Sequence, residues 1–164
     1  MLFIRMAHLW KRHAASHFPS RHPYAPVVYK NRYRVEWRDV DPQRHVNNAA
    51  YLSYIENCVM DMAREKGWPA ERIEQEGFAI FARQYRIEYL RPAFLDDELE
   101  IGTWVSDKRR ATAVRHYEIR RAETDELLVR ARALWVWINR QNGMPIRIPA
   151  AFEEAFADNF TEES

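Results

Sequence analysis

Cysteine, glycine and long apolar runs are all scarce in this chain. Cys58 is the only cysteine among 164 residues, which excludes an internal disulfide and a zinc site built from several cysteines. There are only four glycines, so a glycine-rich loop that cradles phosphates is not expected. No apolar run reaches the roughly 18 residues of a membrane-spanning helix. The formal net charge of +1 indicates neither a nucleic-acid nor a membrane partner.

Acidic residues are missing from the first 35 positions, and Glu36 is the first carboxylate. The same segment is rich in arginine, lysine and histidine, which is typical of organelle-targeting peptides. A disordered basic tail, or an extension ahead of a true start at Met6, would have the same composition. We therefore divide the chain into a basic extension over 1–28, a folded domain over 29–157 and a tail over 158–164. We expect a cytoplasmic protein, unless the basic extension directs import into an organelle.

The strongest periodic segment predicts a helix over residues 48–66. Its apolar residues recur every three or four positions and form a wide stripe. The stripe consists of Tyr51, Ile55, Cys58, Val59 and Met62. Asn47 or Asn48 can cap the start of this helix, and Gly67 suits its end. The width of the stripe indicates a helix that is buried along most of its length.

Strand-like segments lie on both sides of this helix. Alternating polar and apolar residues predict a first strand over 30–37, with Tyr33, Val35 and Trp37 on one face. Four further strands are expected after the helix, and short breaks with turn residues imply antiparallel pairing. Their ranges are 79–89, 98–106, 113–121 and 127–139, with short helices expected over 69–76 and 149–156. This order predicts an α+β fold with one helix laid across one sheet.

Polar side chains gather in the loop over 38–47 that joins the first strand to the helix. Asp39, Asp41, His45 and Asn48 lie there or at the helix start. A helix N-terminus presents free backbone N–H groups and a partial positive charge, which can stabilise a developing oxyanion. A carboxylate beside it can act as a nucleophile or as a general base. Asp39 is expected to bond to nearby backbone instead, as aspartates often do in loops.

Residues 39–56 resemble the signature of the 4-hydroxybenzoyl-CoA thioesterase family of hotdog proteins. They read Asp-Val-Asp-Pro-Gln-Arg-His-Val-Asn-Asn-Ala-Ala-Tyr-Leu-Ser-Tyr-Ile-Glu. Tyr-Leu-Arg-Pro at 89–92, Val-Trp-Ile at 136–138 and Pro-Ile-Arg-Ile-Pro at 145–149 look like further family segments. The resemblance implies a hotdog fold, in which a five-stranded antiparallel sheet wraps around one long central helix.

The resemblance also implies an activity and an assembly. The family hydrolyses acyl-CoA or acyl-carrier-protein thioesters without a metal or a separate cofactor, since coenzyme A is part of the substrate. Its active sites form between two protomers, so a homodimer is implied, often paired into a tetramer.

Four residues of the motif take roles through the resemblance. Asp41 matches the catalytic carboxylate, which either attacks the thioester or activates water. The backbone N–H of Asn48 matches the donor that polarises the thioester carbonyl, and His45 and Asn47 match positions that shape the site. Considered without the resemblance, Asp41 could simply turn the chain before Pro42, and His45 could be a packing or hydrogen-bonding residue.

Candidate substrate contacts lie on the helix and in a basic turn. Tyr51 belongs to the apolar stripe and Glu56 lies on its flank, where some hotdog thioesterases carry their catalytic carboxylate. Lys108, Arg109 and Arg110 could meet the 3′-phosphate or pyrophosphate of coenzyme A, or they could be a solvated turn.

Two other functions compete with thioester hydrolysis. Hotdog hydratases and dehydratases pair an aspartate with a histidine in a Gly-Asp-x-Asn-Pro type of segment, which this chain lacks. A non-catalytic module that binds acyl groups or coenzyme A would have no need of Asp41. We therefore expect a thioester hydrolase.

Overall fold

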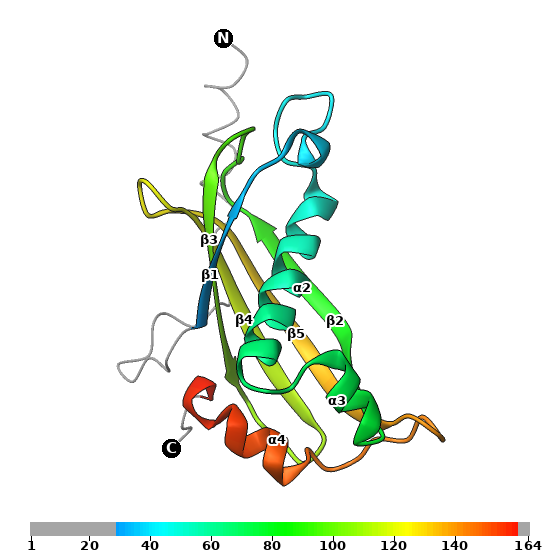
Figure 1. The fold of residues 1–164 in the computed structure, drawn as a ribbon. Helices are drawn as coiled ribbons and strands as arrows, with labels where there is room; N and C mark the ends of the chain where they lie inside the picture. The colour runs from blue at the N-terminus through cyan, green and yellow to red at the C-terminus, as the bar shows by residue number, and fades with distance from the viewer. Residues whose placement is uncertain (1–28, 161–164) are drawn as a thin grey trace.

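The structure, a computed structural model, describes residues 29–160, so the predicted basic extension over 1–28 lies outside the described residues. Five strands form one sheet in the order β1-β3-β4-β5-β2, and all neighbouring strands are antiparallel. They are β1 (Tyr29–Arg34), β2 (Phe78–Tyr89), β3 (Glu98–Ser106), β4 (Thr112–Arg121) and β5 (Glu126–Asn139). The long helix α2 (Asn48–Glu65) lies across one face of this sheet (Figure 1). The predicted α+β arrangement, a curved five-stranded sheet around one long helix, is confirmed.

Helix α2 forms where its periodicity predicts it. The side chain of Asn47 caps its start by accepting a hydrogen bond from the N–H of Ala49 at 2.9 Å. Gly67, with φ of 75°, follows its end in the left-handed conformation that suits glycine. All five residues of the predicted apolar stripe are buried, and Tyr54 joins them. The helix therefore supplies one layer of the core and the sheet supplies the other.

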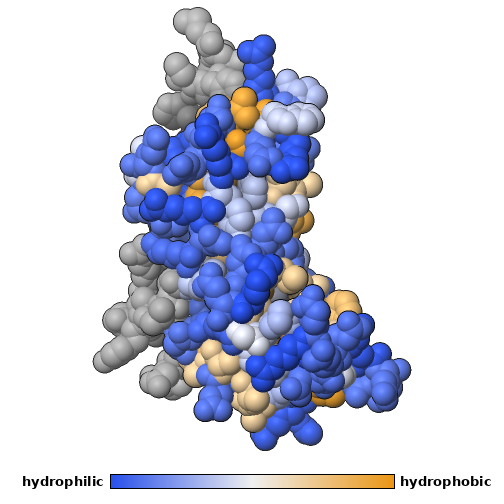
Figure 2. Space-filling view, in the orientation of Figure 1, coloured by the Kyte–Doolittle hydropathy of each residue, from blue (hydrophilic) through white to orange (hydrophobic). Residues whose placement is uncertain are grey.

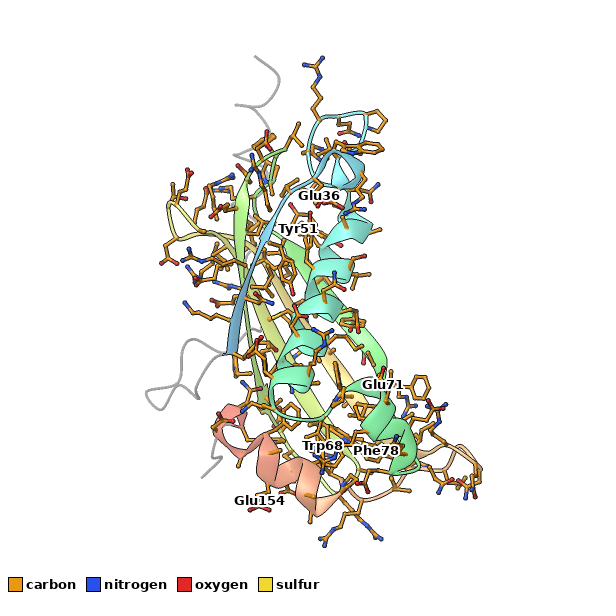
Figure 3. All side chains as sticks on the ribbon, viewed as in Figure 1. Glu36, Tyr51, Trp68, Glu71, Phe78 and Glu154 are labelled. Atoms are coloured by element: carbon orange, nitrogen blue, oxygen red, sulfur yellow. The ribbon has the colours of Figure 1, made fainter. Side chains whose placement is uncertain are left out.

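Three further helices close the end of the core that is distant from the start of α2 (Figure 1). They are α3 (Ala70–Gln75), α4 (Ala150–Ala155) and the short 3-10 helix η2 (Ala157–Asn159). Aromatic rings pack together at this end, where Figure 3 labels Trp68 and Phe78. Phe152 lies 5.2 Å from Trp68 and 4.3 Å from Phe156 between ring centroids. This packing anchors the C-terminal segment to the domain.

The prediction for the first strand is wrong at its end. The strand stops at Arg34, and Val35 then exchanges backbone hydrogen bonds with residues 96 and 97. Glu36 and Asp39 bond each other's backbone reciprocally and turn the chain into the 3-10 helix η1 (Trp37–Asp39). Trp37 therefore leaves the face of Tyr33 and Val35 and is 80% exposed.

Residues 158–160, which the sequence assigned to a tail, pack on the domain. Asn159 is buried and its side-chain amide donates to the carbonyl of Thr103 at 2.9 Å. Phe160 forms a parallel bridge with Val105.

The face of the molecule in Figure 2 is mostly hydrophilic, with apolar residues in small scattered groups. Among residues 29–160, no helix is both long and apolar enough to cross a membrane.

Candidate active site

A tight turn brings Asp41 and His45 opposite each other. Val40 and Val46 form an antiparallel bridge, and the N–H of Asp41 donates to the carbonyl of His45 at 3.0 Å. Arg44 completes the turn with φ of 67°, a left-handed conformation that costs a non-glycine residue some strain. Val46 is buried and its N–H donates to the carbonyl of Ala93 at 2.8 Å, which fixes the turn to the domain.

The carboxylate of Asp41 has one oxygen bound within the turn and one beside the imidazole. Oδ1 accepts a hydrogen bond from the N–H of Gln43 at 2.8 Å, and Oδ2 lies 3.5 Å from Nδ1 of His45. The other ring nitrogen, Nε2, lies 3.2 Å from Oε1 of Gln43. Both side chains are partly open to solvent, with 18% of Asp41 and 25% of His45 exposed. This leaves Oδ2 as the carboxylate oxygen that can meet a substrate or a water molecule.

The start of α2 offers a free donor next to this turn. The N–H of Asn47 donates to the carbonyl of Asp39 at 2.8 Å, so the chain enters the helix directly beside the loop. Asn48 is the first helical residue. Within residues 29–160, no acceptor bonds its N–H, as expected for the first turn of a helix. Its carbonyl accepts from the hydroxyl of Tyr89 at 3.1 Å, which holds the helix start against β2.

Asp39 has a structural role, as the sequence predicts. Its Oδ2 accepts from the hydroxyl of Tyr54 at 2.8 Å and from the N–H of Glu36 at 3.0 Å. Burial, followed by the bond to Asp39, raises the pKa of Tyr54, so this phenol stays protonated as a donor. Asp39 therefore ties the loop to α2 and leaves Asp41 as the carboxylate available for chemistry.

Tyr51 and Glu56 lie in different environments. Tyr51 is buried, and its hydroxyl accepts from the N–H of Ala93 at 3.0 Å, so it positions the loop over 90–97. Figure 3 places Tyr51 and Glu36 at the end of the molecule that carries the site. Glu56 is exposed and accepts a hydrogen bond from the hydroxyl of Tyr85 on β2.

The basic turn is not brought to Asp41 within the described chain. Strand β3 starts beside the loop that bonds Val35 and ends just before Lys108, Arg109 and Arg110. A strand of this length places the two ends roughly 25–30 Å apart. Lys108 pairs with Glu153 of α4 instead.

Sequence reasoning missed the contribution of the loop over 90–97. Its residue Ala93 bonds both Val46 and Tyr51, and Tyr89 just before it bonds Asn48. The segment Tyr-Leu-Arg-Pro at 89–92 was the available signal, but its partners lie about 40 residues away in the chain.

In the described part of the chain, no group of three or more His, Cys, Asp or Glu side chains is placed to hold a metal ion.

The chain is similar to known proteins over most of the described residues. The family model described as the thioesterase-like superfamily matches residues 35–156. An acyl-CoA thioester hydrolase, YbgC from Escherichia coli, is 30% identical over 123 residues, covering 75% of this chain and 91% of the relative.

Two solved structures share the fold. A 1,4-dihydroxy-2-naphthoyl-CoA thioesterase from Synechocystis superposes with a TM-score of 0.75 at 21% identity, covering 80% of this chain and 96% of its own. A Staphylococcus aureus protein solved in complex with CoA superposes with a TM-score of 0.76 at 15% identity. The match covers 85% of this chain and 89% of that protein. At these identities the two structures support the fold alone.

Proposed function

The chain belongs to the thioesterase-like superfamily, and on this premise we propose that it hydrolyses acyl-CoA thioesters at the turn that carries Asp41. One observation carries the proposal: the partly exposed Asp41 carboxylate and the free N–H of Asn48 belong to one short loop and the helix start that follows it. A thioester bound there would direct its carbonyl oxygen to the N–H of Asn48. The N-terminal end of α2 would stabilise the negative charge that develops on this oxygen.

The chemical step follows from these two groups. Asp41 Oδ2 either attacks the carbonyl carbon or removes a proton from a water molecule that attacks it. The carbon–sulfur bond breaks, and coenzyme A leaves as a thiolate that takes up a proton. If Asp41 is the nucleophile, water then hydrolyses the acyl–aspartyl anhydride and restores the carboxylate. His45, held between Asp41 and Gln43, would orient the carboxylate in either route.

Coenzyme A is the thiol carrier that we propose, since YbgC is named for acyl-CoA thioesters. We also propose a homodimer, with dimers pairing into a tetramer. Strand β2 supports the dimer, because it is an edge of the sheet and its other side carries no strand in residues 29–160. Arg109 and Arg110 lie too far from Asp41 of their own protomer, so they could reach the phosphates of coenzyme A only at a partner's site.

The first test is Asp41→Asn, which keeps the shape of the side chain and removes its charge. We expect kcat for thiol release from a panel of acyl-CoAs to fall by at least about 10²-fold, the scale of a lost acid–base or nucleophilic group. The matched control is Asp158→Asn, which removes an exposed carboxylate that pairs with Lys66 far from the turn. Full activity in the Asp41 variant would refute the assignment. Hydration of an enoyl-CoA without thiol release would favour the hydratase instead.

A further inference from the structure

Arg115 is a buried cation without an anionic partner among residues 29–160. It lies on the helix-facing side of β4, is 5% exposed, and its Nη1 donates to Oγ1 of Thr103 at 3.2 Å and to Oδ1 of Asn159 at 3.0 Å. Its guanidinium also lies 5.3 Å from the ring centroid of Trp135. All of these partners are neutral, and no carboxylate of residues 29–160 forms an ion pair with it. Burial therefore disfavours the charged form and lowers the pKa of Arg115.

Other buried donors of the domain also lack acceptors. Within the described chain, four buried side-chain atoms have no hydrogen-bond partner: Arg115 Nε, Tyr117 Oη, Trp135 Nε1 and Trp137 Nε1. All four can donate, whereas none of the four is a carbonyl or carboxylate oxygen. An unpaired donor in a protein interior costs stability, so natural structures rarely leave several together. Two of these donors, on Arg115 and Tyr117, lie on the same side of β4 and would suit a ligand that only accepts hydrogen bonds.

The sheet register places small residues beside Arg115 and Tyr117. On β5, Ala133 lies between Arg115 of β4 and Tyr85 of β2, and Ala131 lies next to Tyr117 in the same way. Both alanines are buried on the inner face of the sheet, where their small side chains keep Tyr85, Tyr117 and Arg115 as the large neighbours of one another. Tyr85 continues the cluster toward the surface, where its hydroxyl donates to the exposed Glu56. The cluster therefore extends from the protein interior to the edge strand β2.

The cluster also lies on the flank of α2 that begins at the candidate active site. Asn48, Leu52 and Glu56 follow one another at four-residue spacing, so they share one side of the helix. Eight residues of helix span about 12 Å. An acyl group whose carbonyl meets Asn48 could extend along this flank and present its far end to Tyr85, Tyr117 and Arg115.

We propose that Arg115 and Tyr117 bind a carboxylate at the far end of the acyl group, so that the preferred substrates are ω-carboxyacyl-CoA thioesters. This inference rests on the proposed thioesterase function. A carboxylate offers only acceptor oxygens, and the planar guanidinium matches its geometry. Glu56 opposes an anionic ligand, but it is exposed and screened by solvent, whereas the charge of Arg115 is buried. The ligand's carboxylate would displace the Tyr85–Glu56 contact as it enters.

Binding to the Asp41→Asn variant tests this inference without turnover. Isothermal titration would compare ω-carboxyacyl-CoAs of graded length, from succinyl-CoA to sebacoyl-CoA, with saturated acyl-CoAs of matched length. We expect at least one ω-carboxyacyl-CoA to bind about tenfold or more tightly than its matched partner. Equal affinity at every length would overturn the proposal.

Variants of the cluster complete the test. Arg115→Met should remove the preference, and Tyr117→Phe, which deletes only a hydroxyl, should reduce it if the arginine variant does not fold. Arg120→Met is the matched control, because Arg120 lies on the same strand, pairs with Glu118 and faces away from α2. A preference that survives both cluster variants would refute the site. If no thioester is hydrolysed but the binding preference persists, the proposed function fails, and Arg115 and Tyr117 stand as a carboxylate-binding site without the substrate assignment. If thioesters are hydrolysed but no preference is measured, this inference fails and the proposed function stands.

Discussion

At the scale of single residues, Cys58 carries a thiol that the fold keeps out of reach. It is fully buried on the helix face that meets the sheet, and its Sγ lies 3.7 Å from the carbonyl oxygen of Ile101. Burial raises its pKa to about 12, so the thiolate is scarce at neutral pH. Because the thiolate is the reactive form, Cys58 serves the core and not catalysis.

Native protein should therefore resist thiol reagents. With Ellman's reagent at pH 8, we expect almost no reaction in buffer and one thiol per chain in guanidinium chloride, since unfolding returns the pKa to its ordinary value. Rapid reaction of the native protein would show that Cys58 is accessible and would contradict a purely structural role.

Sequence patterns predicted the residues whose roles are local, and missed those whose roles depend on distant contacts. A cap at Asn47 or Asn48 and the buried stripe of α2 follow from spacing alone, and the structure assigns the cap to Asn47. The bond between Tyr51 and Ala93 could not be predicted, because nothing near Tyr51 in sequence indicates it, and the substrate contact of Tyr51 stays a prediction. Trp37 was placed on a buried face because alternation does not show where a strand stops. The sequence also could not predict that Asp41 and His45 lie opposite each other, because this arrangement depends on a bridge between Val40 and Val46.

At the scale of elements, β1 docks on α2 through a polar network around Asp61. The Tyr33 hydroxyl and the Asn31 side-chain amide each donate to Oδ2 of Asp61 at 2.6 Å, and Arg64 bonds Oδ1 at 2.9 Å. The hydrogen bond from Tyr33 is the largest cause that lowers the pKa of Asp61 below its ordinary 3.8. The charged carboxylate is thus the form that holds the edge strand to the helix.

The contribution of Asp61 to stability should depend on pH. A carboxyl group whose pKa is lower in the folded state stabilises the fold above the unfolded-state pKa, and this stabilisation is lost as pH falls through the folded-state value. Asp61→Asn should therefore cost about 1 kcal/mol of unfolding free energy at pH 7, because the site is partly exposed. The difference from wild type should shrink as pH falls below about 4.

Urea unfolding of both proteins at a series of pH values measures this effect. Asp96→Asn is the control, because Asp96 pairs with Arg34 in a much more exposed position and should change stability little. A destabilisation of Asp61→Asn that is the same at pH 3 and pH 7 would contradict the electrostatic account.

At the scale of the whole molecule, the sheet ends in a long strand with an open side. The twelve residues of β2 pair with β5 on one side only in the described chain. Phe81 on this strand is 56% exposed, and Met60 on the adjacent side of α2 is 47% exposed. Long unprotected edges invite pairing with another chain, which agrees with the proposed homodimer.

A charge placed on this edge should separate the protomers. We expect Phe81→Glu to lower the mass measured by light scattering after size-exclusion chromatography, and to lower thioesterase activity in parallel if the sites require both chains. Met144→Glu is the matched control, since Met144 is 62% exposed in the turn after β5. An unchanged mass with unchanged activity would place the interface elsewhere.

The overall fold was more predictable than the site because repeated patterns determine it. The order of strands and helices, their bounds to within a few residues and the antiparallel pairing all followed from periodicity and short turns. The distance between the basic turn and Asp41 could not be predicted in this way, because it depends on the direction in which β3 runs.

The left-handed backbone at Arg44 limits which amino acids a mutagenesis library could carry there. Glycine, asparagine and aspartate adopt this conformation at little cost, whereas valine, isoleucine and threonine would push the turn open. Among random substitutions at position 44, we therefore expect the folded, active variants to carry mostly glycine, asparagine or aspartate. Substitution at this position could therefore adjust the rigidity of the turn while Asp41 and His45 themselves stay unchanged.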